Sequence, residues 1–181
     1  MALKFRRVVT GHRQDGTSCF LSGDLAEATV KQVGRGLRFF ELWETDGPLA
    51  SNEGLDDAGK RPFSHHPPAG GTRFRIVEFL PDSEHDEASV SGDFESMDVV
   101  RQVESNDPTM HRNETVDYNI ILSGEIFAVT EEGEMLLRPG DVIIQRGTAH
   151  TWRNRSGRPC VFASVMVSAE PLARFDGDND E

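Results

Sequence analysis

The side chains best suited to chemistry in this sequence come in two groups. His111, Asn113 and Asp117 lie an even number of positions apart, and so do His150 and Trp152. Successive side chains of a β-strand point to opposite faces, so each group shares one face of an extended segment. If both segments line one barrel, two imidazoles and one carboxylate converge inside it. The expected catalytic residues are therefore His111, Asp117 and His150.

These three groups predict a metal centre or an acid–base pair. Two imidazoles and one carboxylate form the facial site that binds Fe(II) or Mn(II) and leaves positions open for a substrate or O₂. The same donors suit Zn²⁺ with one position left for water. In the alternative, the pocket holds no metal, and His111 and Asp117 form a hydrogen-bonded pair that is either structural or a general acid–base couple.

Short apolar segments separated by glycine-containing turns fill the C-terminal half. This spacing predicts an all-β sandwich or closed barrel. The expected strands are Tyr118–Leu122, Glu125–Thr130, Met135–Leu137, Val142–Gln145, Thr151–Asn154 and Cys160–Val167.

The N-terminal half is predicted to add strands at Arg7–Thr10, Ser18–Leu21, Leu37–Trp43 and Thr72–Phe79. Thr45 to Gly71 is rich in Gly, Pro, Asp and Ser, which predicts a long loop. We expect His65 and His66, within that loop, to be solvated. Apolar residues at helical spacing predict one short helix over Phe94–Val103.

Several further residues are candidates for the pocket wall. Trp152 shares the face of His150, so it either forms a wall for a planar ligand or is a core residue of the barrel. Gln145 precedes the Gly147 turn, and Arg73 or Arg75 could hold an anion. Ile121 and Phe127 are candidates for the apolar surroundings.

Length and charge set limits on the molecule. The 181 residues form one domain: residues 1–107 complete the barrel, residues 108–170 carry the motifs, and residues 171–181 are an acidic tail that we expect to be disordered. A net charge of −12 disfavours nucleic acids and anionic membranes, and the acidic surface favours a neutral or weakly charged substrate.

The expected location is the cytoplasm. The N-terminus leads into charged residues without the apolar run of a signal peptide. No apolar stretch approaches membrane-spanning length. Cys19 and Cys160 lie in no metal or redox motif, so we expect two inert thiols in a reducing compartment.

The two polar groups resemble the conserved motifs of the cupin superfamily. The first motif, G-x5-H-x-H-x3,4-E-x6-G, appears as His111-x-Asn113-x3-Asp117-x6-Gly124. The second, G-x5-P-x-G-x2-H-x3-N, appears as Gly140-x4-Gln145-x-Gly147-x2-His150-x3-Asn154. Asparagine thus stands where the first motif has its second histidine.

The resemblance implies a small single-domain cupin: a double-stranded β-helix, or jelly roll, with extra N-terminal strands. It implies a divalent transition metal (Fe, Mn, Zn or Ni) held by His111, Asp117 and His150, with Asn113 as a weak fourth ligand. The implied activity is that of a dioxygenase, decarboxylase or isomerase acting on a small organic molecule. A metal-free ligand-binding module remains the alternative.

The resemblance also implies a homodimer. Small cupins often pair with N-terminal strands added to the neighbour's sheet, which covers an otherwise exposed sheet edge.

Overall fold

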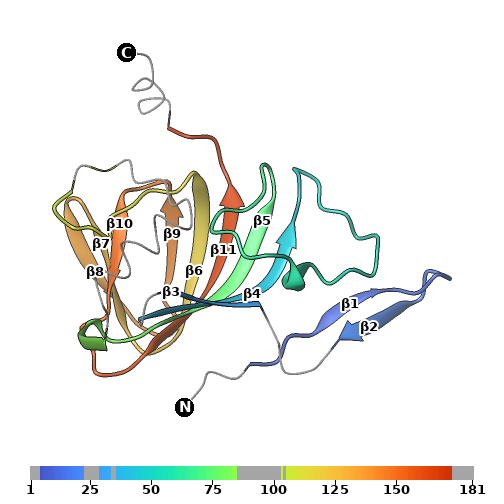
Figure 1. Cartoon of the computed structure of the whole chain (residues 1–181), viewed down its shortest axis with the longest axis horizontal. Coiled ribbons are helices and arrows are strands. Elements are labelled where there is room, and N and C mark those ends of the chain that lie inside the picture. Colours follow the sequence, from blue (N-terminus) through green and yellow to red (C-terminus); the bar gives the residue numbers. More distant parts are fainter. Residues whose placement is uncertain (1–4, 23–28, 34–35, 85–102, 104, 173–181) are drawn as a thin grey trace.

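The chain folds into antiparallel β-sheets that curl into a jelly-roll barrel, as the sequence predicts (Figure 1). A computed structural model describes residues 5–22, 29–33, 36–84, 103 and 105–172. The predicted helix at Phe94–Val103 and most of the acidic tail fall outside these ranges, apart from Val103. Within them, no helix is long and apolar enough to cross a membrane.

Two sheets enclose the core. The larger has the order β3-β4-β5-β11-β6-β9, and the smaller has the order β10-β7-β8. Apolar side chains from both sheets pack into one cluster between them. The larger sheet consists of β3 (Thr29–Val33), β4 (Leu37–Thr45), β5 (Thr72–Phe79), β11 (Cys160–Ser168), β6 (Thr115–Ser123) and β9 (Val142–Arg146), and the smaller of β10 (His150–Arg153), β7 (Ile126–Thr130) and β8 (Gly133–Leu137).

Strand β6 shows how the barrel interior is divided. Its inward positions are Thr115, Asp117, Asn119 and Ile121, all buried, and they alternate with more exposed residues. Polar side chains therefore enter the barrel at the start of the strand and apolar ones near its end. This gradient places a polar chamber at one end of an otherwise apolar barrel.

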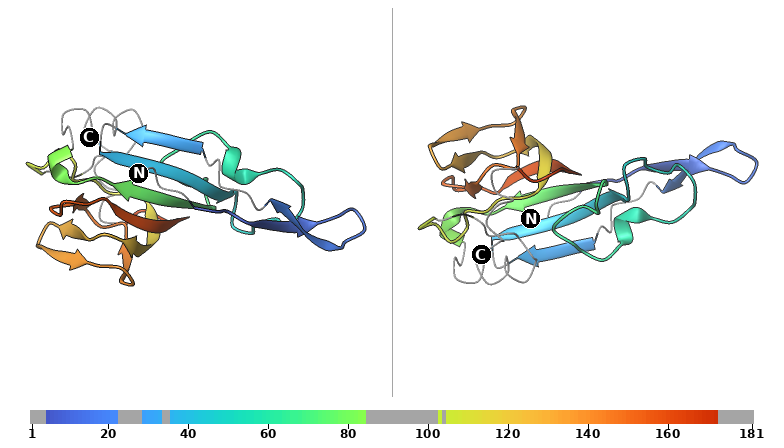
Figure 2. Two further views of the ribbon diagram at one scale, coloured as in Figure 1. Left: turned by 90° about the horizontal axis from the view of Figure 1, so that it is seen from below. Right: turned by 90° about the horizontal axis from the view of Figure 1, so that it is seen from above.

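The N-terminal region adds a hairpin and a tethered loop. Strands β1 (Val9–His12) and β2 (Ser18–Ser22) pair with each other and project away from the barrel (Figure 2). The loop between β4 and β5 contains the short turn η1 (Ala58–Lys60), and a second such turn, η2 (Asp82–Glu84), follows β5. The Arg7 guanidinium fixes this loop by pairing with the carboxylate of Asp57.

A glycine of the first motif is required by close backbone approach. Gly124 has φ of +73°, and a Cβ at this position would lie 2.3 Å from the carbonyl oxygen of Pro159. An L side chain is strained in that conformation and has no room there. Gly124 therefore allows the β6–β7 turn to pack against the start of β11.

Candidate active site

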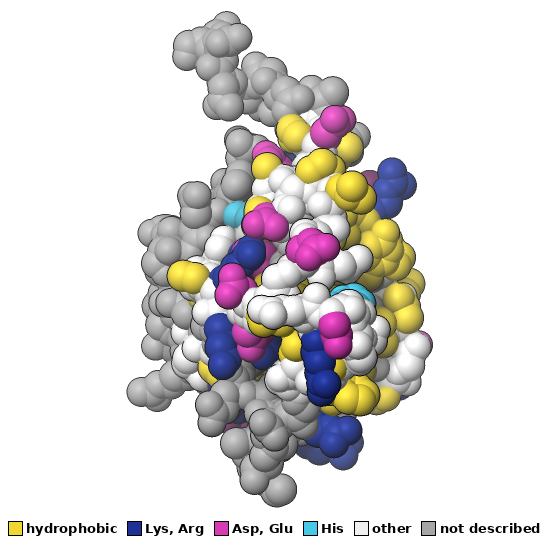
Figure 3. Space-filling view, turned by 90° about the vertical axis from the view of Figure 1, so that its right-hand side faces the viewer, with side chains coloured by type: hydrophobic (Ala, Val, Ile, Leu, Met, Phe, Trp, Pro, Cys, Tyr) yellow, Lys and Arg dark blue, Asp and Glu magenta, His cyan; other side chains and the backbone are white. Residues whose placement is uncertain are grey.

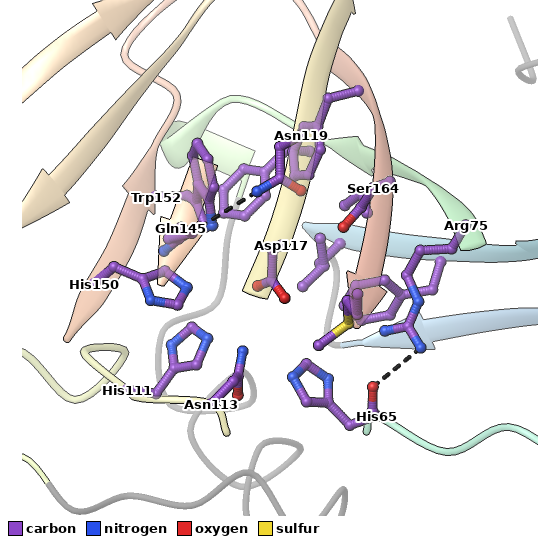
Figure 4. Close-up of a pocket in the computed structure, with 16 residues that line it drawn as sticks. His65, Arg75, His111, Asn113, Asp117, Asn119, Gln145, His150, Trp152 and Ser164 are labelled. Carbon is purple, nitrogen blue, oxygen red and sulfur yellow. Dashed lines mark hydrogen bonds between the residues drawn. The ribbon is translucent and has the colours of Figure 1, made fainter. Parts of the chain in front are cut away.

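A cavity of about 70 Å³ occupies the polar end of the barrel (Figure 4). A cavity needs roughly 10–15 Å³ of such accessible space to hold one water molecule, so this one has room for a small organic group. Apolar residues form one part of the wall: Leu37, Phe39, Val77, Phe79, Trp152, Phe162 and Met166. Polar residues form the rest: His65, Arg75, His111, Asn113, Asp117, Asn119, Gln145, His150 and Ser164.

His111 and His150 form a close imidazole pair. A backbone bridge joins their segments, with the His111 nitrogen donating to the His150 oxygen at 3.0 Å and the reverse bond at 2.9 Å. The two ring centroids are 4.3 Å apart. This bridge places two rings, far apart in sequence, side by side in the cavity (Figure 4).

The hydrogen bonds of the pair fix the tautomer of both rings. His111 Nδ1 lies 2.9 Å from the Thr109 carbonyl oxygen, and His150 Nδ1 lies 2.8 Å from that of Thr148. A carbonyl oxygen only accepts, so each Nδ1 carries the proton and donates it. Each neutral ring therefore has its lone pair on Nε2.

Burial keeps both rings neutral. Removal from water lowers the pKa of His111, and it lowers the pKa of His150 to about 3, with the neighbouring His111 ring acting in the same direction. Neutral imidazole is the form that accepts a proton or binds a metal.

Asp117 is buried close to this pair on β6. Burial raises the pKa of its carboxyl to about 6, although the Thr115 hydroxyl and the Arg75 charge act against that rise. Its Oδ1 atom makes no hydrogen bond within the protein. A carboxyl with this pKa can donate or accept a proton near neutral pH.

The donor set fits a metal ion in part. A carbonyl at Nδ1 is the usual second partner of a metal-binding histidine, and both His111 and His150 have one. Yet nowhere in the described ranges do three or more His, Cys, Asp or Glu side chains form a group that could hold a metal. Asn113 Oδ1 is buried without a hydrogen bond, but an amide oxygen suits transition metals poorly.

The two candidate arginines of β5 have different surroundings. Arg75 lines the cavity, and its Nε lies 3.0 Å from Glu41 Oε1. Arg73 does not line it, because its guanidinium pairs with the carboxylates of Glu41 and Glu44 on β4. The strand register brings Glu44 opposite Arg73, so of the two candidate arginines it is Arg75 that reaches the cavity.

Of the other four candidates for the pocket wall, two line the cavity and two do not. Trp152 and Gln145 line the cavity, with the Trp152 ring stacked on Phe162 at 5.2 Å. Ile121 is fully buried in the apolar core and is not part of the wall. Phe127 lies on the opposite face of β7 from the buried Ile126, with the Arg155 guanidinium 4.6 Å from its ring centre. The prediction that Phe127 surrounds the ligand is therefore wrong.

His65 is a site residue that the sequence did not indicate. Two further polar residues of the cavity wall that the sequence did not single out are Asn119 and Ser164. The expectation of a solvated position for His65 is wrong, since its side chain is only 5 % exposed and lines the cavity. The carbonyls of Ser64 and His65 accept hydrogen bonds from Arg75 Nη2 at 3.0 and 3.1 Å. The following Pro67-Pro68 pair was the one local sign of a stiffened segment.

Comparison with known proteins agrees with this architecture. The family model described as "Cupin domain" matches residues 99–167. The phomopsin biosynthesis cluster protein C' of Diaporthe leptostromiformis is 34 % identical, over 94 % of this chain and 82 % of its own length. The oryzines biosynthesis cluster protein J of Aspergillus oryzae is 31 % identical, over 92 % of this chain and 84 % of its own length.

A third relative has a name that states a type of activity. The cupin-domain-containing oxidoreductase srdB of Neurospora crassa is 27 % identical, over 92 % of this chain and 74 % of its own length. These relatives match nearly the whole chain, including the N-terminal half that lies outside the family model.

Proposed function

Because this chain belongs to the cupin superfamily and carries a cupin type-2 domain, we propose that it is an enzyme acting on a small organic molecule in the barrel cavity. His111, His150 and Asp117 are the groups that meet the reacting atoms. The observation that carries this proposal is the neutral imidazole pair, which faces the cavity together with a buried carboxyl group. Relatives named as oxidoreductases and biosynthesis cluster proteins support a role in modifying such a compound.

The proposed chemistry is proton transfer on the bound molecule. The Nε2 lone pairs of His111 and His150 accept hydrogen bonds from the substrate, because both Nδ1 atoms already donate to carbonyls. Asp117 takes up the substrate proton as a carboxylate and returns it as a carboxylic acid, since its pKa of about 6 allows both forms near neutral pH. The stacked Trp152 and Phe162 rings offer a flat apolar surface that orients a planar molecule and excludes water.

A divalent transition metal, whether Fe, Mn, Zn or Ni, would be held by His111 and His150, with Asp117 as the carboxylate and Asn113 as a weak further donor. Such an ion would supply polarisation of a substrate oxygen. The carboxylate would have to approach the imidazole pair, since the three side chains as they lie do not form a group that could hold a metal.

A ligand-binding module without catalysis is the second candidate. It is favoured by the asparagine at position 113 and by the incomplete donor set. A barrel that only binds needs the apolar wall and the polar anchors but no proton-transferring carboxyl.

Exchange of substrate protons with deuterated water separates the two candidates. We expect the wild-type protein to catalyse exchange of the C–H protons next to the carbonyl group in a panel of small cyclic ketones and saturated cyclic aldehydes. The exchange is measured by NMR. Asp117→Asn and His150→Ala should each remove this exchange, because the first lacks the proton-transferring carboxyl and the second lacks a hydrogen-bond acceptor for the substrate. His66→Ala, changed in the same loop as His65, should keep it. Exchange by none of the panel, or equal exchange by Asp117→Asn, would favour the binding module.

Metal content is measured separately on protein purified without chelators. Stoichiometric Fe, Mn, Zn or Ni that is lost in His150→Ala would establish the metal-dependent form. Metal-free protein that still catalyses the exchange would establish the acid–base form.

A further inference from the structure

The cavity has a second polar wall besides the imidazole pair. It consists of His65, Arg75 and Asn113, whose side chains are 5 %, 1 % and 5 % exposed. All three have polar atoms that are buried without a hydrogen bond within the protein. Burying such atoms without partners costs free energy, so a wall of them indicates a ligand that completes the bonds.

Arg75 supplies a donor to the cavity. Its Nε faces Glu41 and its Nη2 donates to two backbone carbonyls of the loop. Its Nη1 is buried and makes no hydrogen bond, and one end of the guanidinium points into the cavity (Figure 4). The rings of Phe39 and Phe63 lie 5.0 and 5.5 Å from the guanidinium carbon. These rings shield the charge from water, which strengthens its interaction with a bound group.

His65 and Asn113 stand beside this donor. The His65 ring points into the cavity between Asn113 and Arg75 (Figure 4). The Asn113 side chain is near enough to act on the pKa of this ring, but neither ring nitrogen has a partner of good hydrogen-bond geometry. Burial lowers the pKa of His65 well below its usual value, so the ring is neutral and has one N–H to donate. The amide of Asn113 can rotate to present either its oxygen or its NH₂.

The ion pairs behind this wall leave one donor of Arg75 for a ligand. The buried guanidiniums of Arg73 and Arg75 pair with two buried carboxylates, which belong to Glu41 and Glu44. These four charges balance one another. Arg75 Nη1 has no acceptor among them, so an anionic oxygen in the cavity would meet a charged donor.

We propose that His65, Arg75 and Asn113 bind an anionic oxygen of the substrate, a carboxylate or a phenolate on a planar ring. The proposal rests on the proposed function and specifies its substrate class. The anion accepts charge-assisted hydrogen bonds from Arg75 Nη1 and a neutral one from His65. Its ring lies along the apolar wall, where Trp152 and Phe162 stack, and its reacting atoms face the imidazole pair.

This substrate class differs from the neutral molecule that the acidic surface suggests. The net charge of −12 acts on the rate at which an anion arrives. Affinity depends instead on the groups inside the cavity. Asp117 is the one acidic side chain among the described residues that line the cavity, and Arg75 is the one guanidinium.

The test is calorimetric titration of the full chain with benzoate, 4-nitrophenolate and the neutral benzyl alcohol. We expect at least one of the two anions to bind about tenfold or more tightly than benzyl alcohol, since a charge-assisted bond is roughly twice as strong as a neutral one. Which anion binds tells a carboxylate site from a phenolate site.

Two variants and a control localise the binding. His65→Ala should weaken the anion about tenfold and leave benzyl alcohol unchanged, because it removes one hydrogen bond to the anion alone. The double variant Glu41→Gln/Arg75→Gln removes a buried charge together with its partner, so the fold is not left with an unpaired ion. It should weaken the anion about a hundredfold or more. His66→Ala is the matched control and should bind as the wild type does.

Equal affinity for the anions and benzyl alcohol would overturn the proposal, and so would an anion affinity that His65→Ala leaves unchanged. Absence of anion binding would overturn it as well. Proton exchange in the His150→Ala and Asp117→Asn variants is a separate measurement. Failure of the inference is therefore distinguishable from failure of the proposed function.

Discussion

The neutral forms of both acid and base are favoured inside this cavity. Burial lowers the pKa of His150 to about 3 and raises the pKa of Asp117 to about 6. Each shift has the same cause, since an environment with little water penalises the charged form of either group. A site of this kind is suited to exchanging protons with a substrate and is costly for the fold.

Because burying the ionised Asp117 carboxyl destabilises the fold, we predict that Asp117→Asn stabilises the protein at about pH 7.5. An unfolded aspartate has a pKa near 3.9, and the folded value is about 6, so between these values the native state binds more protons. Stability due to this group is therefore greatest below about pH 4 and is lost as the pH rises through 6. We expect a gain on the order of 2 kcal/mol at about pH 7.5 and little difference near pH 4.

Urea unfolding of the wild type and Asp117→Asn at both pH values measures this difference. Loss of stability in the variant at the higher pH would contradict the assignment of a raised pKa to Asp117.

Parity within a strand identified part of the site from sequence. His111, Asp117 and His150 line one cavity because each lies on an inward-facing position of an extended segment. Neither Arg73 nor Phe127 could be placed in this way. The carboxylate of Glu44 on the neighbouring strand pairs with the Arg73 guanidinium and keeps it out of the cavity. Phe127 can be placed only when it is known which face of β7 meets the core. Both depend on how strands pair, which is a long-range property.

At the scale of elements, Asn154 of the second motif is a brace between strands. Its side chain is completely buried. Nδ2 donates to the carbonyls of Phe79 at 3.0 Å and Arg158 at 2.9 Å, and Oδ1 accepts from the Ser156 backbone nitrogen at 3.1 Å. The side chain thus links the ends of β5 and β10 to the turn before β11.

Asn154→Ala should therefore destabilise the fold without changing the chemistry of the cavity. Four hydrogen bonds are lost, one of them from the Ser156 hydroxyl, and two carbonyls are left without this donor, so we expect about 2–4 kcal/mol by urea unfolding. Ser156→Ala removes only that one of the four, together with the hydroxyl's bonds to Arg158, and should cost about 1 kcal/mol. A loss below about 0.5 kcal/mol for Asn154→Ala would contradict the role of brace.

Strand prediction succeeded where apolar and polar residues alternate. Strand β3 was missed, because polar Lys31 and Gln32 interrupt its apolar pattern and its identity comes from pairing with β4. The loop between β4 and β5 was predicted in extent but not in path. Arg7 and Arg75 determine that path: Arg7 is distant from the loop in sequence, and Arg75 lies on β5, where its side-chain direction depends on how the strands pair.

At the scale of the whole molecule, exposed apolar side chains gather on the projecting hairpin and on the outer face of the larger sheet, besides scattered positions elsewhere. Phe20 is 77 % exposed on the projecting β1–β2 hairpin. The outer faces of β6 and β9 expose further large apolar side chains: Tyr118, Ile120, Leu122, Val142 and Ile144. Figure 3 shows hydrophobic side chains gathered along one edge of the molecule, beside a mixture of acidic and basic groups. Exposed apolar patches of this kind favour an interface.

We predict a homodimer in which the hairpin of one copy packs on the other. A two-stranded hairpin is marginally stable by itself and gains from such packing. Light scattering after gel filtration at micromolar concentration should give twice the chain mass. Phe20→Ser should weaken the dimer about tenfold or more. Met135→Ser, which changes another largely exposed apolar residue on β8, should not. A monomeric wild type would end this prediction.

The protonation state of the imidazole pair is the most direct test that the cavity is a reactive centre. Ring-nitrogen NMR of histidine-labelled, chelator-treated protein reports the tautomer and charge of each ring as the pH is lowered. We predict that His111 and His150 carry their proton on Nδ1, and that His150 stays neutral to well below the usual pKa of about 6.5, in keeping with its value of about 3. A proton on Nε2, or a charge that appears on His150 near pH 6.5, would contradict the proposed site.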